Sequence, residues 1–288
     1  MPDPHPTARI HRTAIVEEGA TLGAEVTIGP YAFVGPYATI GAGSRLDQGA
    51  IVQGDTVLGE GNHLFPYVVL GSIPQDKKYG GERAHLEIGD RNVIREHVTV
   101  HIGTEGGGGV TRIGSDNLLM AGAHVGHDCQ VGNHCVLANF TGLAGHVSVG
   151  DHAILGGHTG VHQFVRIGQH CMAGGGSKVG QDIPPFTIAQ GYPARIRGIN
   201  HIGLRRRGFS DDTIKALRQA YRKLFYGAEA VFSDTIARVR EEFAKQDEVS
   251  ALLDFLTEAY RSGRGFMRPP PKEVESDSSV KAQPSEAT

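Results

Sequence analysis

The chain has 288 residues and a formal net charge of -3, with 41 glycines, 7% aromatic residues and no tryptophan. The abundant glycine and scarce aromatic side chains exclude a core built mainly of large aromatic residues, and they indicate frequent turns. The slightly acidic balance argues against a general nucleic-acid-binding protein, which needs a basic face, so we expect no nucleic-acid partner.

The N-terminal segment, Met1 to Thr7, is short, polar and rich in proline, and no apolar stretch of a signal peptide follows it. No run of the sequence approaches the roughly 18 apolar residues of a membrane span. The three cysteines are an odd number and form no close pair of the zinc-ribbon type, so we expect no disulfide framework. These features predict a cytoplasmic protein without a transmembrane segment.

A repeat of six residues begins at Ile10. Aliphatic residues occupy its anchor positions without a gap in a first series: Ile10, Val16, Leu22, Ile28, Val34, Ile40, Leu46, Val52, Leu58, Leu64 and Leu70. The register returns at Ile88, and a glycine-rich insertion around Glu105 to Val110 then shifts it by one residue. A second series follows, in which only Ala173 is weak: Ile113, Leu119, Val125, Val131, Leu137, Leu143, Val149, Leu155, Val161, Ile167, Ala173 and Val179.

This period fits neither an amphipathic helix, which repeats every 3.6 residues or so, nor a simple strand, which alternates at every second residue. It fits a short strand and a turn repeated around a three-sided coil. Three hexads then complete one coil, and successive coils stack at a strand spacing of about 4.8 Å. We therefore predict a mainly β protein, a parallel β-helix, in which residues eighteen apart lie nearly above each other.

The cysteines occupy a repeated slot of the hexad. Cys129, Cys135 and Cys171 stand four residues after an anchor, where other hexads carry small residues such as Ala123 and Ala153. Free cysteine commonly packs as a small hydrophobic residue. We therefore predict core positions for all three rather than metal or redox chemistry.

A helical pattern replaces the repeat after about Pro185. Ser210 is a predicted N-cap for a helix with Leu217 on its apolar face, Ser233 for a second helix with Val239, and a third helix contains Leu256. Since a solenoid needs a cap at its ends, this region is expected to provide one. The predicted boundaries are a β-helix over residues 1–190, an α-helical domain over 191–267, and a disordered tail over 268–288, which is rich in Pro, Ser, Glu and Lys.

Histidines gather in the second series, because ten of the fifteen fall between His97 and His170. The stacked hexads that begin at Val125, Leu143 and Val161 carry His127, His146 and His162, at slightly different offsets from their anchors. These three side chains are expected to share one wall, with His124 at the adjacent corner. For His134, His152 and His170 we favour exposed turn positions without a role in chemistry.

The segment His124-Val125-Gly126-His127-Asp128 has the composition of a general base with its orienting carboxylate. Histidine is the side chain whose ordinary pKa lies near neutral pH, and a positioned base accelerates a reaction about 100-fold to 10,000-fold. Glycine in Leu143-Ala144-Gly145-His146 would allow a backbone N–H to approach a developing oxyanion. The pattern suits acyl transfer to a hydroxyl.

Several longer stretches resemble one family, the UDP-N-acetylglucosamine O-acyltransferases of lipid A biosynthesis. They are GSDNLLMAGAHVGHDC from Gly114, LAGHVSVGDHAILGG from Leu143, VHQF from Val161, IPPFTIAQG from Ile183 and RRGFS from Arg206. The resemblance extends from about Ile10 to Met267. It implies a left-handed parallel β-helix with a C-terminal α-helical domain, and the left hand comes from this resemblance alone.

The same resemblance implies an activity without a cofactor or metal. An (R)-3-hydroxyacyl group would pass from acyl carrier protein to the glucosamine 3-hydroxyl of UDP-N-acetylglucosamine, in a homotrimer with active sites between subunits. His127 would be the general base, Asp128 would hold it, and the Gly145 N–H would stabilise the oxyanion. The implied substrate-binding residues are Gln75, Asp76, Lys78, His101, His124, His146, His162, Gln163, Asn200, Arg206 and Arg207. Gly175 matches the position that limits acyl-chain length.

Two details leave alternatives open. Arg195, Arg197 and Arg205 crowd next to Arg206 and Arg207, which favours a phosphate or an acidic carrier protein as partner, although a solvated charged surface would look the same. The chain also departs from the family at two positions. It has Ile202 where the family often has an acidic residue near the nucleotide, and Pro193 where the family often has a histidine, so the contacts with the uridine are left open.

Three rival interpretations fit parts of this pattern. A related β-helix class holds a metal with histidines of neighbouring subunits for carbonic anhydrase chemistry. The N-acyltransferase of the same pathway usually carries a uridine-binding domain before the coil, whereas here the coil begins by Ile10. A purely structural solenoid would leave the histidine wall and the arginine cluster unexplained.

Overall fold

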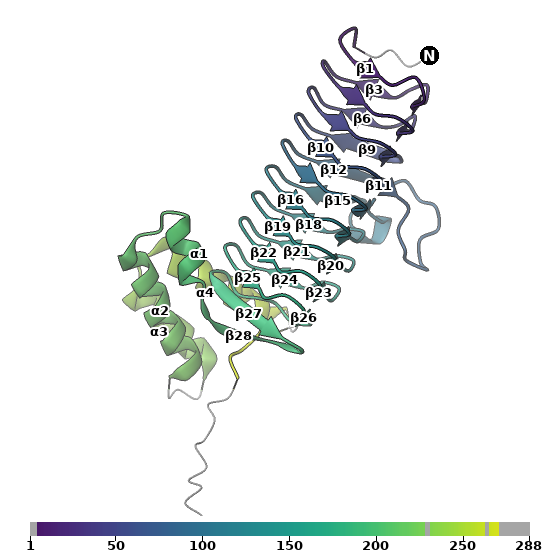
Figure 1. Cartoon of the computed structure of the whole chain (residues 1–288). Helices are drawn as coiled ribbons and strands as arrows, with labels where there is room; N and C mark the ends of the chain where they lie inside the picture. The colour runs from purple at the N-terminus through teal and green to yellow at the C-terminus, as the bar shows by residue number, and fades with distance from the viewer. Residues whose placement is uncertain (1–4, 228–230, 263–264, 271–288) are drawn as a thin grey trace, which may run out of the picture.

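The computed structural model describes residues 5–227, 231–262 and 265–270. Most of the predicted tail, residues 271–288, lies outside the described residues. The chain forms a left-handed parallel β-helix followed by an α-helical region, which is the predicted fold class. Figure 1 shows the coils stacked from β1 downward, with the helices at the far end.

Three sheets form the sides of the coil, and the chain passes through them in the order A, B, C. Sheet A contains β1 (Arg9–Ile10), β4 (Thr27–Ile28), β7 (Arg45–Leu46), β10 (His63–Leu64), β13 (Val93–Ile94), β16 (Leu118–Leu119), β19 (Val136–Leu137), β22 (Ile154–Leu155), β25 (Met172–Ala173), β27 (Thr187–Gly191) and β28 (Ala194–Ile199). Sheet B contains β2 (Ile15–Val16), β5 (Phe33–Val34), β8 (Ile51–Val52), β11 (Val69–Ser72), β14 (Thr99–His101), β17 (His124–Val125), β20 (Gly142–Leu143), β23 (Gly160–Val161) and β26 (Lys178–Val179). Sheet C contains β3 (Thr21–Leu22), β6 (Thr39–Ile40), β9 (Asp55–Leu58), β12 (His85–Ile88), β15 (Val110–Ile113), β18 (Gln130–Val131), β21 (Ser148–Val149) and β24 (Arg166–Ile167).

The register confirms the geometry expected from the hexads. Val125 pairs with Leu143, and Leu143 with Val161, each eighteen residues further along the chain. All three anchors point inward and are buried, and so are Cys129, Cys135 and Cys171, as predicted. Burial raises the pKa of the Cys135 thiol to about 11, which keeps it protonated and unreactive at neutral pH.

Each coil has three corners, and one of them carries both interruptions of the repeat. We call the turns between sheets B and C corner BC, those between C and A corner CA, and those between A and B corner AB. The loop over residues 73–84 leaves corner BC after β11, and the glycine-rich insertion over residues 102–109, which contains the short helix η1 (Glu105–Gly107), leaves it after β14. Both therefore project from the same edge of the stack (Figure 1).

Among the described residues, a hairpin and four α-helices close the C-terminal end of the coil. β27 pairs in parallel with β25 in sheet A, and β28 returns antiparallel to β27 at the edge of that sheet. The predicted domain boundary at residue 190 falls inside β27. The helices are α1 (His201–Arg206), α2 (Asp211–Tyr226), α3 (Phe232–Glu242) and α4 (Asp247–Arg261).

The predicted N-cap Ser210 is confirmed, because its side chain accepts a hydrogen bond from the N–H of Thr213. The prediction for Ser233 is wrong. α3 begins one residue earlier, at Phe232, which packs on the core and lies 5.2 Å from the ring of Phe266. Within the described ranges, no helix is both long and apolar enough to cross a bilayer.

Candidate active site

Corner BC brings His127 and Asp128 together directly after β17. Nδ1 of His127 lies 2.7 Å from Oδ2 of Asp128, and the two side chains are 12% and 0% exposed. Asp128 adopts φ +60° at the turn, a conformation that aspartate tolerates better than most residues. The predicted base and carboxylate therefore form a buried hydrogen-bonded pair. Hydrogen bonding at Nδ1 leaves Nε2 as the ring atom available to a substrate.

The Asp128 carboxylate is held by more than the histidine. Oδ1 accepts a hydrogen bond from the N–H of Thr104 (2.8 Å), and Oδ2 accepts one from the Thr104 hydroxyl (2.7 Å). Thr104 belongs to the glycine-rich insertion over residues 102–109, which in the sequence is recognised only because it shifts the register of the repeat. The sequence interpretation missed this residue. The sequence offers only a weak signal, a threonine two residues before the run of four glycines, Gly106 to Gly109.

His146 faces the pair from the next coil. Its ring centre lies 5.0 Å from that of His127, edge to face, and its Nε2 lies 3.7 Å from Oδ2 of Asp128. The other face of the ring stacks on Phe164 at 4.3 Å. Burial lowers the pKa of His146, assisted by His127 and opposed by the charge of Asp128. His146 is therefore a neutral hydrogen-bonding side chain at neutral pH.

His101 and His124 extend the histidine wall toward the N-terminal coils. Nδ1 of His124 lies 2.7 Å from the Thr99 hydroxyl, and the His101 ring packs edge-on against His124 at 4.8 Å. Burial lowers the pKa of both rings, that of His101 to about 4. Nδ1 of His101 is buried and has no hydrogen-bond partner among the described residues. Both side chains are neutral at physiological pH.

The loop over residues 73–84 reaches the same site. The charges of Asp76 and Lys78 act on the pKa of His146, Asp76 raising it and Lys78 lowering it, so both side chains lie near that ring. Asp76 also accepts a hydrogen bond from the backbone N–H of Lys78 (3.0 Å). Gln75 precedes them in the loop and is exposed. The loop thus brings charged groups of both signs to the histidine wall.

Gly145 lies against the ring of His127. A Cβ at this position would come within 2.5 Å of Cε1 and Nε2 of that ring, so the site has room only for glycine. No acceptor for the Gly145 N–H is found in the part of the chain that the structure describes. Gln163 occupies the equivalent turn position one coil further on, next to His162, and both are exposed. The predicted oxyanion donor therefore lies beside the predicted base.

The structure does not bring Asn200, Arg206 or Arg207 to this corner. Asn200 is buried, accepts from Gly203 N–H as the N-cap of α1, and donates to the carbonyl of His170 (3.0 Å). Arg207 donates to the carbonyl of His152 (2.8 Å). His152 and His170 belong to corner CA, so these residues lie one corner away from His127. Arg206 is exposed on α1.

The expectation for the remaining histidines needs correction. Of His134, His152 and His170, only His134 is exposed. His152 stacks between His134 (4.7 Å) and His170 (4.6 Å). Phe209, from the turn before α2, covers the edge of His170 at 4.9 Å. Burial lowers the pKa of His170 to about 4, assisted by His152 and Arg207 and opposed by Asp151. This column fastens the helical region to the coil, a contact between distant segments that the repeat does not reveal.

Gly175 lies on corner AB, at the opposite edge of sheet B from His127. Between these two edges, a Cβ added at Gly142 or Gly160 would meet nothing within 4 Å. On the outer face of sheet B, the strands between β17 and β26 therefore have glycine at these positions, and no neighbouring atoms cover them. This strip connects the histidine wall with Gly175.

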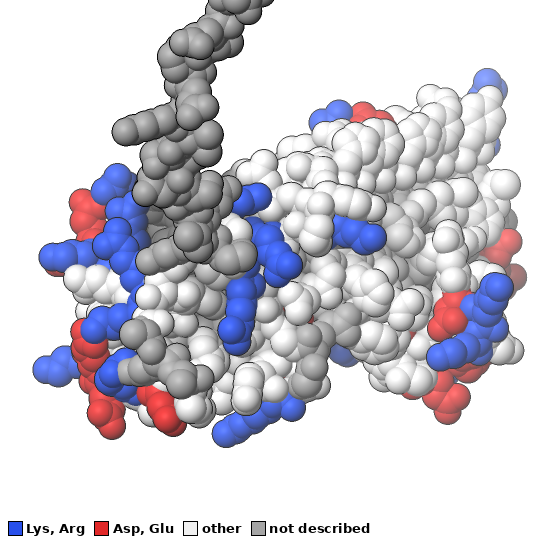
Figure 2. Space-filling model, turned by 90° about the horizontal axis from the view of Figure 1, so that it is seen from below, with Lys and Arg blue, Asp and Glu red and all other residues white. Residues whose placement is uncertain are grey.

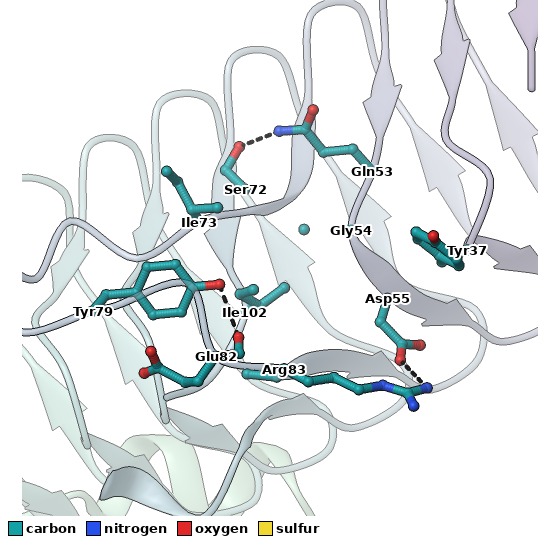
Figure 3. A pocket seen from close by; sticks show the side chains of 12 residues that line it. Tyr37, Gln53, Gly54, Asp55, Ser72, Ile73, Tyr79, Glu82, Arg83 and Ile102 are labelled. Carbon is teal, nitrogen blue, oxygen red and sulfur yellow. Dashed lines mark hydrogen bonds and ion pairs between the residues drawn. The ribbon is translucent and has the colours of Figure 1, made fainter. Parts of the chain in front are cut away.

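A cavity of about 820 Å³ opens on the N-terminal side of the 73–84 loop (Figure 3). Gln53 donates to the Ser72 hydroxyl (2.9 Å) on one of its sides, and Arg83 pairs with Asp55 (3.2 Å) on another. Tyr79, from the loop, lines it together with residues of the coil. None of the site residues predicted from the sequence lines this cavity.

Donor atoms of His127, Asp128 and His146 lie within 4.8 Å of one another, so these three are the described side chains able to hold a metal ion. The 2.7 Å contact between His127 and Asp128 is shorter than the separation of two ligands on a tetrahedral zinc ion, about 3.4 Å for bonds of about 2.1 Å. The arrangement fits a base and its carboxylate better than a metal centre.

Comparisons with known proteins agree with this geometry. The family model described as UDP N-acetylglucosamine O-acyltransferase, domain 2, matches residues 182–267, and that of the bacterial transferase hexapeptide matches residues 111–145. LpxA of Acinetobacter baumannii is 41% identical, over 92% of this chain and 99% of that chain, with a TM-score of 0.80. The UDP-N-acetylglucosamine acyltransferase of Campylobacter jejuni is 39% identical, over 91% and 100%, with a TM-score of 0.85. The O-acyltransferase of Moraxella catarrhalis is 41% identical, over 92% and 99%, with a TM-score of 0.80.

Proposed function

Because the chain belongs to the UDP-N-acetylglucosamine O-acyltransferase family, we propose that corner BC transfers an (R)-3-hydroxyacyl group from acyl carrier protein to the glucosamine 3-hydroxyl of UDP-N-acetylglucosamine. This reaction is the first step of lipid A biosynthesis. The observation that carries the assignment of the site is the buried His127–Asp128 pair, with Gly145 against the ring. We also propose that the reaction takes place in the cytoplasm, the location expected from the sequence.

In the proposed mechanism, Nε2 of His127 takes the proton from the 3-hydroxyl as its oxygen attacks the thioester carbonyl. Asp128 stabilises the imidazolium that forms, and the Gly145 N–H stabilises the oxyanion of the tetrahedral intermediate. The intermediate then expels the thiolate of the carrier, which recovers the proton from His127. The acyl ester and the free carrier thiol are the products.

The surrounding histidines are suited to sugar binding. His101, His124 and His146 all have lowered pKa values because burial disfavours the charged form. A neutral imidazole both donates and accepts hydrogen bonds, as a sugar hydroxyl does. Asp76 and Lys78, on the loop beside His146, are proposed to complete the sugar site.

We propose a homotrimer in which each site is completed by a neighbouring copy. Asn200 and Arg207 bond to corner CA, one corner away from His127 within the chain, and Arg206 precedes Arg207 at the end of α1. If these residues meet the nucleotide, a second copy must bring its corner CA to corner BC of the first. The cyclic arrangement of three copies satisfies this for every site.

The carrier protein is proposed to dock on the helical end. A hollow of about 780 Å³ there is lined by Arg197, His201, Arg218 and Arg222, with Tyr221 at its base. Lysine and arginine side chains gather over this end of the molecule in the view from below (Figure 2). Acyl carrier protein is acidic, so this surface has the complementary charge.

The proposal is tested by incubating the protein with UDP-N-acetylglucosamine and 3-hydroxyacyl carrier proteins of several chain lengths. Mass spectrometry should detect the acylated nucleotide sugar and the free carrier thiol. The absence of product at every chain length would contradict the assignment. Stoichiometric zinc or iron in the purified protein, with activity lost on chelation, would instead favour metal chemistry.

A further inference from the structure

The glycine-rich insertion between β14 and β15 covers the carboxylate of Asp128. Thr104 lies in the insertion and is buried, with 7% of its surface exposed. Its N–H and its hydroxyl donate to the two different oxygens of Asp128, at 2.8 and 2.7 Å. We propose that Thr104 is a positioning residue for the base: it holds Asp128 in the one orientation that serves His127. This inference rests on the proposed function.

The two hydrogen bonds of Thr104 select between two possible partners of Asp128. Oδ2 lies 2.7 Å from Nδ1 of His127 and 3.7 Å from Nε2 of His146, so the two rings compete for one oxygen. A carboxylate that accepts a hydrogen bond from Thr104 at each of its oxygens cannot rotate toward His146. Its bond to His127 then keeps the proton on Nδ1 and leaves Nε2 free to accept one from the substrate.

Gly107 shows how closely the insertion covers the carboxylate. A Cβ at this position would collide with the carboxyl carbon and both oxygens of Asp128. The neighbouring Gly106 has open space, since a Cβ there would meet nothing within 4 Å. The two glycines therefore offer a matched pair of substitutions, only one of which disturbs the contact.

The insertion is anchored to the loop that carries Asp76 and Lys78. Backbone N–H groups of Glu82 itself, Gly80 and Glu105 hold the pKa of the Glu82 carboxyl below its usual range. Gly80 lies in the loop and Glu105 follows Thr104, so Glu82 joins the two projections of corner BC. The insertion that contains Thr104 and the loop that contains Asp76 and Lys78 therefore lie next to each other at Glu82.

The first test compares Thr104→Val with Thr104→Ser. Valine keeps the shape of threonine but lacks the hydroxyl that donates to Asp128. Losing a hydrogen bond to a charged group that acts in the transition state should lower kcat about 10-fold to 100-fold. KM for UDP-N-acetylglucosamine should stay unchanged, and serine should restore most of kcat. A normal kcat in Thr104→Val, with the wild type active, would overturn the inference.

The second test asks whether Thr104 acts through Asp128. In an Asp128→Ala background, Thr104→Val should cause no further loss of kcat, because the oxygens it positions are gone. Equal losses in both backgrounds would show a separate structural role. Unfolding temperatures of the four proteins would identify any loss that reflects misfolding.

The third test uses the glycine pair. Gly107→Ala should lower kcat at least as much as Thr104→Val, whereas Gly106→Ala should leave kcat at the wild-type value. Equal activity of the two alanine variants would contradict the proposed cover. If the wild type itself made no acylated product, the proposed function would fail; if it did and all Thr104 and Gly107 variants matched it, only this inference would fail.

Discussion

At the scale of single residues, Asp128 organises the site more than any other side chain. It accepts hydrogen bonds from His127 and from two groups of Thr104 and leaves no exposed surface. A buried carboxylate of this kind needs several donors, because burying an unpaired charge is costly. Fixing the carboxylate in this way also fixes the tautomer of the histidine beside it.

A first prediction concerns the stacked histidines of corner CA. The folded protein holds the pKa of His170 near 4, below the ordinary value of 6.5. The unfolded chain therefore binds more protons, and stability falls as the pH drops from about 6.5 toward 4. The wild type should therefore lose free energy of unfolding between pH 7.5 and pH 5.5. His170→Phe keeps an aromatic ring in the stack and should make this loss smaller by about 1 kcal/mol.

Urea unfolding of the wild type and of His170→Phe at pH 7.5 and pH 5.5 measures this difference. His101 also has a lowered pKa, but it is common to both proteins and cancels in the comparison. The same pH dependence in both proteins would show that His170 does not contribute.

Residues with a local signature were predictable. His127, Asp128 and Gly145 stand in short motifs whose chemistry is visible in the sequence, and the structure places them in contact. Thr104 was not predictable, because its role depends on an insertion whose path no period describes. The exposure of His152 and His170 was mispredicted, because His152 is stacked between two other rings and Phe209 covers His170 from outside the repeat.

At the scale of elements, the site depends on where the repeat is interrupted. Regular hexads form a three-sided coil with short turns, and short turns alone do not form a deep binding site. Both long interruptions leave from corner BC, and they bring Asp76, Lys78 and Thr104 to the histidine wall. The strands and their register could be predicted from the hexads. The paths of the loop over residues 73–84 and of the insertion over residues 102–109 could not, because neither follows the repeat.

A second prediction follows from the bare face of sheet B. If the acyl chain extends from the histidine wall past Gly142 and Gly160, Gly175 lies at the far edge of its path. Gly175→Met should then lower kcat/KM for long 3-hydroxyacyl carriers by about 10-fold or more, while a carrier several carbons shorter is used as well as before. A ladder of carriers tested on both proteins measures it, and an equal loss at every length would contradict the path.

At the scale of the whole molecule, the proposed homotrimer predicts that residues from two copies of the chain share each site. Co-expression of His127→Ala with a tagged Arg206→Glu variant gives mixed oligomers that can be purified by the tag. A shared site should restore activity in the mixture well above the average of the two parents. An activity equal to that average would place each site within one chain.

The charge of the helical end gives another prediction. Arg218→Glu with Arg222→Glu should raise KM for the acyl carrier protein about 10-fold and leave KM for UDP-N-acetylglucosamine unchanged, because charge complementarity mainly guides association. The wild type should also lose affinity for the carrier as salt increases. Unchanged KM values for the carrier would remove this face from the docking surface.

The base itself provides the most direct test of the account. His127→Ala should lower kcat for acyl transfer about 100-fold or more while UDP-N-acetylglucosamine still binds, because only the proton acceptor is removed. His11→Ala, at an exposed turn of the first coil between β1 and β2, serves as the matched control and should keep the wild-type kcat. A His127→Ala enzyme that acylates UDP-N-acetylglucosamine at the wild-type rate would contradict the central claim.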